Sequence, residues 1–268
     1  MNRTIFILSA SSGIGQALME RYLAAGDTVI GTCRMAGALD AFADHPRAIT
    51  LELDLNDPDM LNTAAATFAE RGLAWDVFIA CNGTMEPIGP FMTLDGADWQ
   101  QTICTNALLP CRLLQALYPH RRADGVATAV FMAGGGTNNP FTNYSAYCLS
   151  KIILIKMCEL LDDEAPDLKT FIVGPGYVRT KIHDETLRAG VRAGVNLDKT
   201  KAFLAGDGTP LDDIFDCIEW GTAQPRAAIG GRNISVVHDS WRADPEGLSQ
   251  RLQDDGDMFK LRRQGNLQ

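Results

Sequence analysis

The chain has 268 residues, 46% of them hydrophobic, which is enough to bury a substantial core as one large domain or two small ones. Its formal net charge of −9 argues against nucleic acid or an anionic membrane as a partner, because both attract clustered lysine and arginine. No apolar run approaches the roughly 18 residues that cross a bilayer, so no membrane span is expected.

The seven cysteines form no CxxC pair and lie mostly in apolar segments. They are typical of reduced core residues in a cytosolic protein, and not of disulfides or metal ligands. The strand-like run at 5–8 follows the first residue so closely that no basic region and cleavage site of a secretion signal fit before it. We therefore expect a cytoplasmic protein without a metal site.

Seven short apolar or β-branched runs predict strands, in chain order at 4–8, 28–32, 48–53, 75–80, 126–132, 169–174 and 233–237. Amphipathic segments of helical length separate most of them, at 14–25, 57–71, 96–118 and 144–163. Strands that alternate with helices of this length predict βαβ units and a parallel sheet with helices on both faces. The predicted fold class is α/β, a doubly wound parallel sheet of three layers in a single domain.

A long segment at 181–225 interrupts this alternation before the last strand. We predict two helices in it, over the carboxyl edge of the sheet. The residues after 238 are rich in Asp, Arg and Gln, which is typical of a short helix or a partly disordered tail. The predicted boundaries are a domain at 1–238 and a polar C-terminal tail at 239–268.

The carboxyl ends of parallel strands are where binding sites of such sheets gather. The first strand is followed by Ser9-Ala10-Ser11-Ser12-Gly13-Ile14-Gly15, whose glycines allow a tight turn and a close approach of backbone N–H groups to a pyrophosphate. Arg34, after the second strand, puts a cation where the ribose of an adenosine would lie. Asp54 and Leu55, after the third, are placed to hold an adenine. Each of these is also common as an ordinary turn, surface cation or strand end.

Tyr147 and Lys151 stand four residues apart in the predicted helix 144–163, so they share one helix face. A tyrosine with a pKa of about 10 is a poor acid or base at neutral pH, and a neighbouring positive charge lowers that pKa. By itself, however, this spacing occurs by chance in most proteins.

Taken together and in order, these motifs resemble the short-chain dehydrogenase/reductase family over residues 3–237, as a dinucleotide-binding domain of the single-domain type. Further matches are Asn82-Gly83 after the fourth strand, Asn106 within a helix, and the run at 175–180 after the sixth strand. The resemblance implies a Rossmann-type sheet, a nicotinamide dinucleotide and hydride transfer at a carbonyl or alcohol.

The resemblance also implies the roles of individual residues. Tyr147 would exchange a proton with the substrate oxygen, Lys151 would bond the nicotinamide ribose and lower the phenol pKa, and Asn106 would anchor a water between Lys151 and solvent. The implied cofactor-binding residues are Ser9, Ser11, Ser12, Gly13, Ile14, Gly15, Arg34, Asp54, Leu55, Cys81, Asn82, Gly83, Tyr147, Lys151, Pro175, Gly176, Val178 and Thr180. Because Arg34 stands where a carboxylate would bind a 2′-hydroxyl, NADP is the expected cofactor and NAD the alternative.

The chain departs from the family pattern at three places. Ser9 replaces the first glycine of the turn, which must then accept a Cβ. Ala80 and Cys81 replace two asparagines, and Asn82 follows one place late. Gly134 stands where the family keeps a serine that orients the substrate oxygen.

Loss of one such donor typically costs about 10²- to 10³-fold in rate. The side chains of Thr137, Asn138 or Asn139, or the backbone N–H groups of the glycine run at 134–136, are candidates to replace it. Glycines without side chains would also open space beside Tyr147 for a substrate that brings its own hydroxyl.

These residues are compatible with three functions. The first is an NADP-dependent reductase with a rebuilt oxygen-binding corner, acting on a small carbonyl or alcohol. The second is a dinucleotide-binding regulatory or scaffold protein without turnover, against which the intact set Asn106, Tyr147 and Lys151 argues. The third is an epimerase or dehydratase with a transient keto intermediate. The helix at 144–163 is apolar on more than one face, which predicts a homodimer or homotetramer.

The substrate loop of this family corresponds to about 181–210. It carries the charged or titratable residues His183, Asp184, Glu185, Arg188 and Arg192. They indicate either a polar substrate or simply the solvated face of an amphipathic helix. His183 lies three residues beyond Thr180 and is a candidate for substrate contact.

Overall fold

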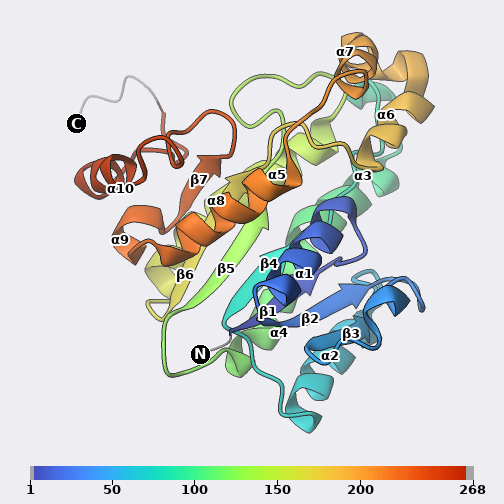
Figure 1. The fold of residues 1–268 in the computed structure, drawn as a ribbon. Coiled ribbons are helices and arrows are strands. Elements are labelled where there is room, and N and C mark those ends of the chain that lie inside the picture. Colours follow the sequence, from blue (N-terminus) through green and yellow to red (C-terminus); the bar gives the residue numbers. More distant parts are fainter. Residues whose placement is uncertain (1–2, 264–268) are drawn as a thin grey trace.

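Apolar side chains predominate on both faces of the central strands, so the sheet is buried between two layers of helices (Figure 1). The computed structural model describes residues 3–263 and contains one parallel sheet in the order β3-β2-β1-β4-β5-β6-β7. The strands are β1 (Thr4–Leu8), β2 (Thr28–Cys33), β3 (Ala48–Glu52), β4 (Val77–Ala80), β5 (Ala127–Met132), β6 (Leu168–Gly174) and β7 (Arg232–Ser235). The predicted single-domain, doubly wound α/β fold is confirmed.

The sheet has one apolar core on each face, and strand β1 shows how its side chains divide between them. Successive side chains of a strand point to opposite faces, so Ile5 and Ile7 enter the first core and Phe6 and Leu8 the second. The first core is covered by α1 (Gly13–Ala24), α8 (Leu211–Ala223), α9 (Arg226–Ile229) and α10 (Pro245–Asp254). The second core is covered by α2 (Pro58–Glu70), α4 (Leu109–Leu117) and α5 (Ser145–Glu164).

The chain changes direction across the sheet at β1, which pairs with β2 on one side and β4 on the other. The register sets Leu8 beside Ala80, so the segments that follow β1 and β4 leave the sheet next to each other. A crevice at such a switch point is where ligands bind in open α/β sheets.

The predicted helix 96–118 is interrupted. It consists of α3 (Gly96–Ile103), a π-helical turn η3 (Cys104–Leu108) and α4. Pro110 has no backbone N–H, so it cannot give the carbonyl of Asn106 its α-helical hydrogen bond. The wider turn at Asn106 follows from that missing donor, and such π-turns are frequent at functional sites.

The segment 181–225 contains three helices, where we predicted two. The first two, α6 (Ile182–Ala189) and α7 (Val195–Leu204), lie beyond the carboxyl ends of the strands (Figure 1). The third is α8, which packs on the sheet through Ile214, Cys217 and Ile218. The remaining short helical turns are η1 (Asp40–Phe42), η2 (Phe91–Thr93), η4 (Tyr118–His120) and η5 (Gly190–Ala193).

The residues after 238 include the expected short helix, α10, and they are not polar throughout. Trp241, Leu248 and Leu252 are buried in the first core. The buried Arg232 of β7 donates hydrogen bonds to the carbonyls of Leu252 and Met258, which ties this segment to the sheet edge. Among residues 3–263 no helix is long and apolar enough to cross a membrane.

Candidate active site

The turn between β1 and α1 presents backbone N–H groups at the carboxyl edge of the sheet. Ser12 is the N-cap of α1, and its hydroxyl accepts a hydrogen bond of 3.1 Å from the N–H of Gly15. A Cβ on Gly15 would lie 2.3 Å from the carbonyl oxygen of Ser9, so only glycine allows this packing. Ser9 has a φ of 60°, a left-handed conformation that costs a non-glycine residue about 1–2 kcal/mol. The turn therefore accepts the Cβ of Ser9, but in a strained conformation.

A cavity of about 500 Å³ opens beside this turn. Most of the predicted cofactor residues line it, namely Ser12, Gly13, Ile14, Arg34, Cys81, Asn82, Gly83, Tyr147, Lys151, Pro175, Gly176, Val178 and Thr180. Ser9 and Ser11 belong to the adjoining turn and Gly15 to the first turn of α1, and none of the three lines the cavity. Asp54 and Leu55 also lie outside the lining. Leu55 packs in the second core, and Asp54 accepts a hydrogen bond from the N–H of Asn56.

The lining residues fit an extended, anionic dinucleotide. The exposed cation of Arg34 follows β2, and the bare backbone of Gly13 follows β1. A Cβ on Gly13 would lie 2.7 Å from Cγ2 of Thr180, so a side chain at position 13 would close the space between the turn and the segment after β6. The cavity thus offers a cation and uncovered N–H groups to phosphates.

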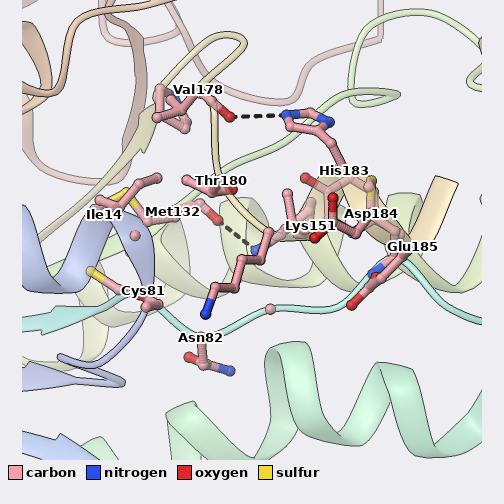
Figure 2. A pocket seen from close by; sticks show the side chains of 18 of the residues that line it. Ile14, Cys81, Asn82, Met132, Lys151, Val178, Thr180, His183, Asp184 and Glu185 are labelled. Atoms are coloured by element: carbon pink, nitrogen blue, oxygen red, sulfur yellow. Dashed lines mark hydrogen bonds between the residues drawn. The ribbon is translucent and has the colours of Figure 1, made fainter. Parts of the chain in front are cut away.

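Tyr147 and Lys151 lie one turn apart on α5 and face the same cavity. Lys151 is 3% exposed, and its Nζ donates a hydrogen bond of 3.0 Å to the carbonyl of Met132 at the end of β5 (Figure 2). Nζ lies 5.6 Å from the centroid of the Tyr147 ring. The predicted proximity of the cation and the phenol is present.

The pKa of the phenol moves in the direction opposite to our prediction. Burial raises the pKa of Tyr147 above its ordinary value, and the carboxylate of Glu185 contributes in the same direction. Burial also lowers the pKa of Lys151 to about 8, so the amine is still mostly protonated at pH 7. In this state Tyr147 is a neutral phenol at pH 7, the form that can donate a proton.

Asn106 holds the loop after β4 against α5. Its Oδ1 accepts a hydrogen bond of 2.9 Å from the N–H of Thr84, and its Nδ2 donates one of 2.8 Å to the carbonyl of the same residue. Nδ2 also lies 3.2 Å from Oγ of Ser150, which donates to the carbonyl of Tyr147. The side chain of Asn106 is therefore occupied by protein groups, and Pro110 cannot give its backbone carbonyl the usual α-helical hydrogen bond.

Gly134 does not leave open space beside Tyr147. A Cβ on this residue would lie 2.0 Å from the phenol oxygen and 2.5 Å from Cζ of the ring, so the tyrosine itself fills the place of a side chain. Thr137, Asn138 and Asn139 are not among the residues that line the cavity. The predicted opening beside Tyr147 is therefore wrong, and these three side chains do not reach into the cavity.

Charged residues of α6 and the turn before it form the outer wall of the cavity, among them Lys181, Asp184, Glu185 and Arg188. His183 also lines the cavity, and its Nε2 donates a hydrogen bond of 2.9 Å to the carbonyl of Val178 (Figure 2). Burial lowers the pKa of His183, which favours the neutral ring in this contact.

Sequence reasoning missed three residues that shape the site, Thr84, Met85 and Ser150. Thr84 and Ser150 bond Asn106, and Met85 lines the cavity and gives its N–H to Glu185. Nothing in the spacing of the sequence marks them, because each acts through a contact with a distant segment.

Comparison with known proteins is consistent with this arrangement. The family model described as short chain dehydrogenase matches residues 3–189. A short chain dehydrogenase, pigC, of Monascus ruber is 26% identical over 250 residues, which cover 88% of this chain and 79% of that protein. A serine 3-dehydrogenase of Agrobacterium fabrum is 27% identical over 232 residues, covering 84% of this chain and 90% of that one.

The same similarity extends to solved structures. A crystal structure of a short-chain dehydrogenase from Streptomyces avermitilis superposes with a TM-score of 0.72 at 26% identity and covers 95% of this chain and 92% of the other.

Proposed function

Because the chain belongs to the short-chain dehydrogenase family and is an NAD(P)-dependent oxidoreductase, we propose that Tyr147 is the group that exchanges a proton with the substrate oxygen. One observation carries this proposal. The buried phenol of Tyr147 and the buried ammonium of Lys151 line the cavity together with the glycine turn that suits a pyrophosphate. Nζ of Lys151 lies 5.6 Å from the centroid of the phenol ring. A carbonyl or alcohol is the substrate class that such a proton donor serves.

The bound dinucleotide would supply the hydride, and the protein's residues would position the substrate and protonate its oxygen. Tyr147, neutral at pH 7, donates its proton to the oxygen of a carbonyl substrate, or takes one from an alcohol once ionised. Lys151 is held by the carbonyl of Met132 next to the phenol, where its charge would bond a ribose hydroxyl. A water near Asn106 would bring a proton from solvent to restore Tyr147 after a carbonyl is reduced, or carry the proton to solvent after an alcohol is oxidised.

NADP is the cofactor we propose. Arg34 lines the cavity after β2 and is exposed, as a residue that meets a 2′-phosphate must be. Burial raises the pKa of Cys33, the residue before Arg34, and the carboxylates of Glu52 and Asp40 contribute in the same direction. Binding of NAD is the alternative that a titration has to compare.

The substrate-binding corner differs from that of relatives with a serine, because Tyr147 packs directly on Gly134. The charged residues of α6 favour a small polar substrate. One relative is named serine 3-dehydrogenase, so serine and other small hydroxy acids are the first compounds to screen, followed by ketones and keto-sugars.

We also propose that the chain is a homodimer or homotetramer through α5. Leu149 and Leu160 of this helix are 43% and 45% exposed, and Leu108 of the neighbouring η3 is 45% exposed. Apolar side chains of this size on two adjacent elements gain by association. Light scattering at micromolar concentration distinguishes an oligomer from a monomer. The seven free cysteines support a reducing compartment such as the cytoplasm.

A fluorescence titration with NADPH, followed by the compound screen, tests the function. Binding with turnover of at least one alcohol or carbonyl compound is the expected result. Binding without any turnover would favour a scaffold protein, and product formation without net consumption of NADPH would favour an epimerase or dehydratase. The named relatives favour neither of these.

A further inference from the structure

Glu185 joins the two walls of the cavity. Its carboxylate, on α6, accepts hydrogen bonds from the N–H groups of Met85 at 2.5 Å and Glu86 at 3.3 Å and from the hydroxyl of Thr84 at 3.1 Å. These donors lie about a hundred positions earlier in the chain, on the loop that follows β4. The carboxylate is the hydrogen-bond acceptor that α6 brings to the N–H of Met85, and it shares the N–H of Glu86 with the hydroxyl of Thr84, which lies 3.3 Å from that nitrogen.

The loop that receives Glu185 is itself fixed to the helix that carries Tyr147. Thr84 is held through both its N–H and its carbonyl by the side chain of Asn106. Asn106 in turn bonds Ser150, one residue before Lys151. A continuous chain of hydrogen bonds thus runs from α6 through the loop to α5.

Other contacts also hold α6, some of them on the same loop. Thr186 bonds the hydroxyl of Tyr144 at 2.9 Å, and Ala189 packs in a small apolar cluster with Met85 and Tyr144. The ion pair of Arg188 with Glu86 is exposed, so it adds little. Within residues 3–263, Glu185 is the α6 residue whose side chain bonds backbone N–H groups of the opposite wall.

We propose that Glu185 is a positioning residue, a latch that fastens α6 to the loop Thr84–Glu86 and so closes the cavity over the substrate side of Tyr147. The proposal rests on the proposed function, since closure matters only where a substrate is held. A charge-assisted carboxylate with three donors is a strong fastening for a helix of eight residues. The latch excludes water and sets the distance between α6 and the phenol.

Hydrogen exchange tests the latch without any substrate, so its outcome is separate from that of the proposed function. In Glu185→Ala we expect at least tenfold faster exchange at the amides of Met85 and Glu86 and in residues 182–189, with the rest of the chain unchanged. Thr84→Val, which keeps the shape but removes one donor, should give a smaller increase at the same places. Glu185→Gln, which keeps one acceptor oxygen, should recover part of the protection.

The matched control is Asp198→Asn, which removes an exposed carboxylate from α7, away from the cavity. Its amide hydrogens should exchange at the same rates as those of the unaltered protein. For a compound turned over in the screen, Glu185→Ala should raise KM about tenfold and leave kcat within about threefold, whereas Asp198→Asn should change neither. Unchanged exchange at Met85 and Glu86 in Glu185→Ala, or a uniform increase over the whole chain, would overturn the proposal.

Discussion

The hydroxyl of Tyr147 rests directly on the backbone of Gly134. A Cβ on Gly134 would lie only 2.0 Å from that oxygen, so the phenol occupies the place of a side chain at position 134. The absence of a side chain at position 134 is therefore what allows the tyrosine to take this position. The site has an altered geometry around Tyr147, and not a gap where a donor was lost.

We expect Gly134→Ser to lower turnover at least tenfold, because the new Cβ must push Tyr147 out of its position. The overpacking should also lower the free energy of unfolding by about 1–3 kcal/mol. Steady-state rates and denaturant unfolding measure both effects.

The matched control for that change is Gly135→Ser. A Cβ on Gly135 would meet Phe141 at 3.6 Å, an ordinary contact, so rate and stability should stay close to those of the unaltered protein. A large gain in activity on simple ketones with Gly134→Ser would instead indicate a decayed enzyme and would favour the scaffold protein.

Replacing Arg34 by Ala should raise the dissociation constant of NADPH about tenfold, as expected for loss of a charge-assisted contact of about 1.5–3 kcal/mol. The dissociation constant of NADH should hardly change, because NADH has no 2′-phosphate. Fluorescence titration of both cofactors measures the difference. An equal loss for NADPH and NADH would show that Arg34 does not read the 2′-phosphate.

The buried ammonium of Lys151 makes stability depend on pH. Its pKa is about 8 when folded and 10.5 by reference when exposed, so between these values the unfolded chain binds more protons and stability rises with pH. Relative to Lys151→Met, the unaltered protein without cofactor should gain about 2–3 kcal/mol in free energy of unfolding from pH 7.5 to 10.5, at roughly 1.4 kcal/mol per pKa unit.

Urea unfolding of both proteins across that range measures the gain, and the comparison cancels most groups that the two share. A difference that does not vary with pH would mean that Lys151 keeps its ordinary pKa when folded.

The fold was predictable because its signals are local. Seven apolar runs separated by helix-length segments specify a parallel sheet, and each predicted strand lies within two residues of the observed one. The turn at 9–15 and the pair Tyr147 and Lys151 were readable for the same reason, since their spacing is short. The interruption at Asn106 also had a local signal, Pro110, which the apolar pattern of 96–118 concealed.

What the sequence did not reveal depends on burial and on distant contacts. The raised pKa of Tyr147 results from its burial, which no residue spacing reports. The space beside Gly134 is filled by a residue thirteen positions away, and Glu185 bonds a loop about a hundred positions earlier. Such contacts follow from the packing of α5 and α6 on the sheet edge, and only the folded chain shows them.

The proton-transfer role of Tyr147 is the central claim, and Tyr147→Phe tests it most directly. The variant keeps the ring that packs on Gly134 and loses only the hydroxyl. Its kcat on a compound from the screen should fall at least about 10²-fold, while the dissociation constant of NADPH stays within a few-fold, because the hydroxyl acts mainly in the transition state. Full activity in Tyr147→Phe would contradict the account.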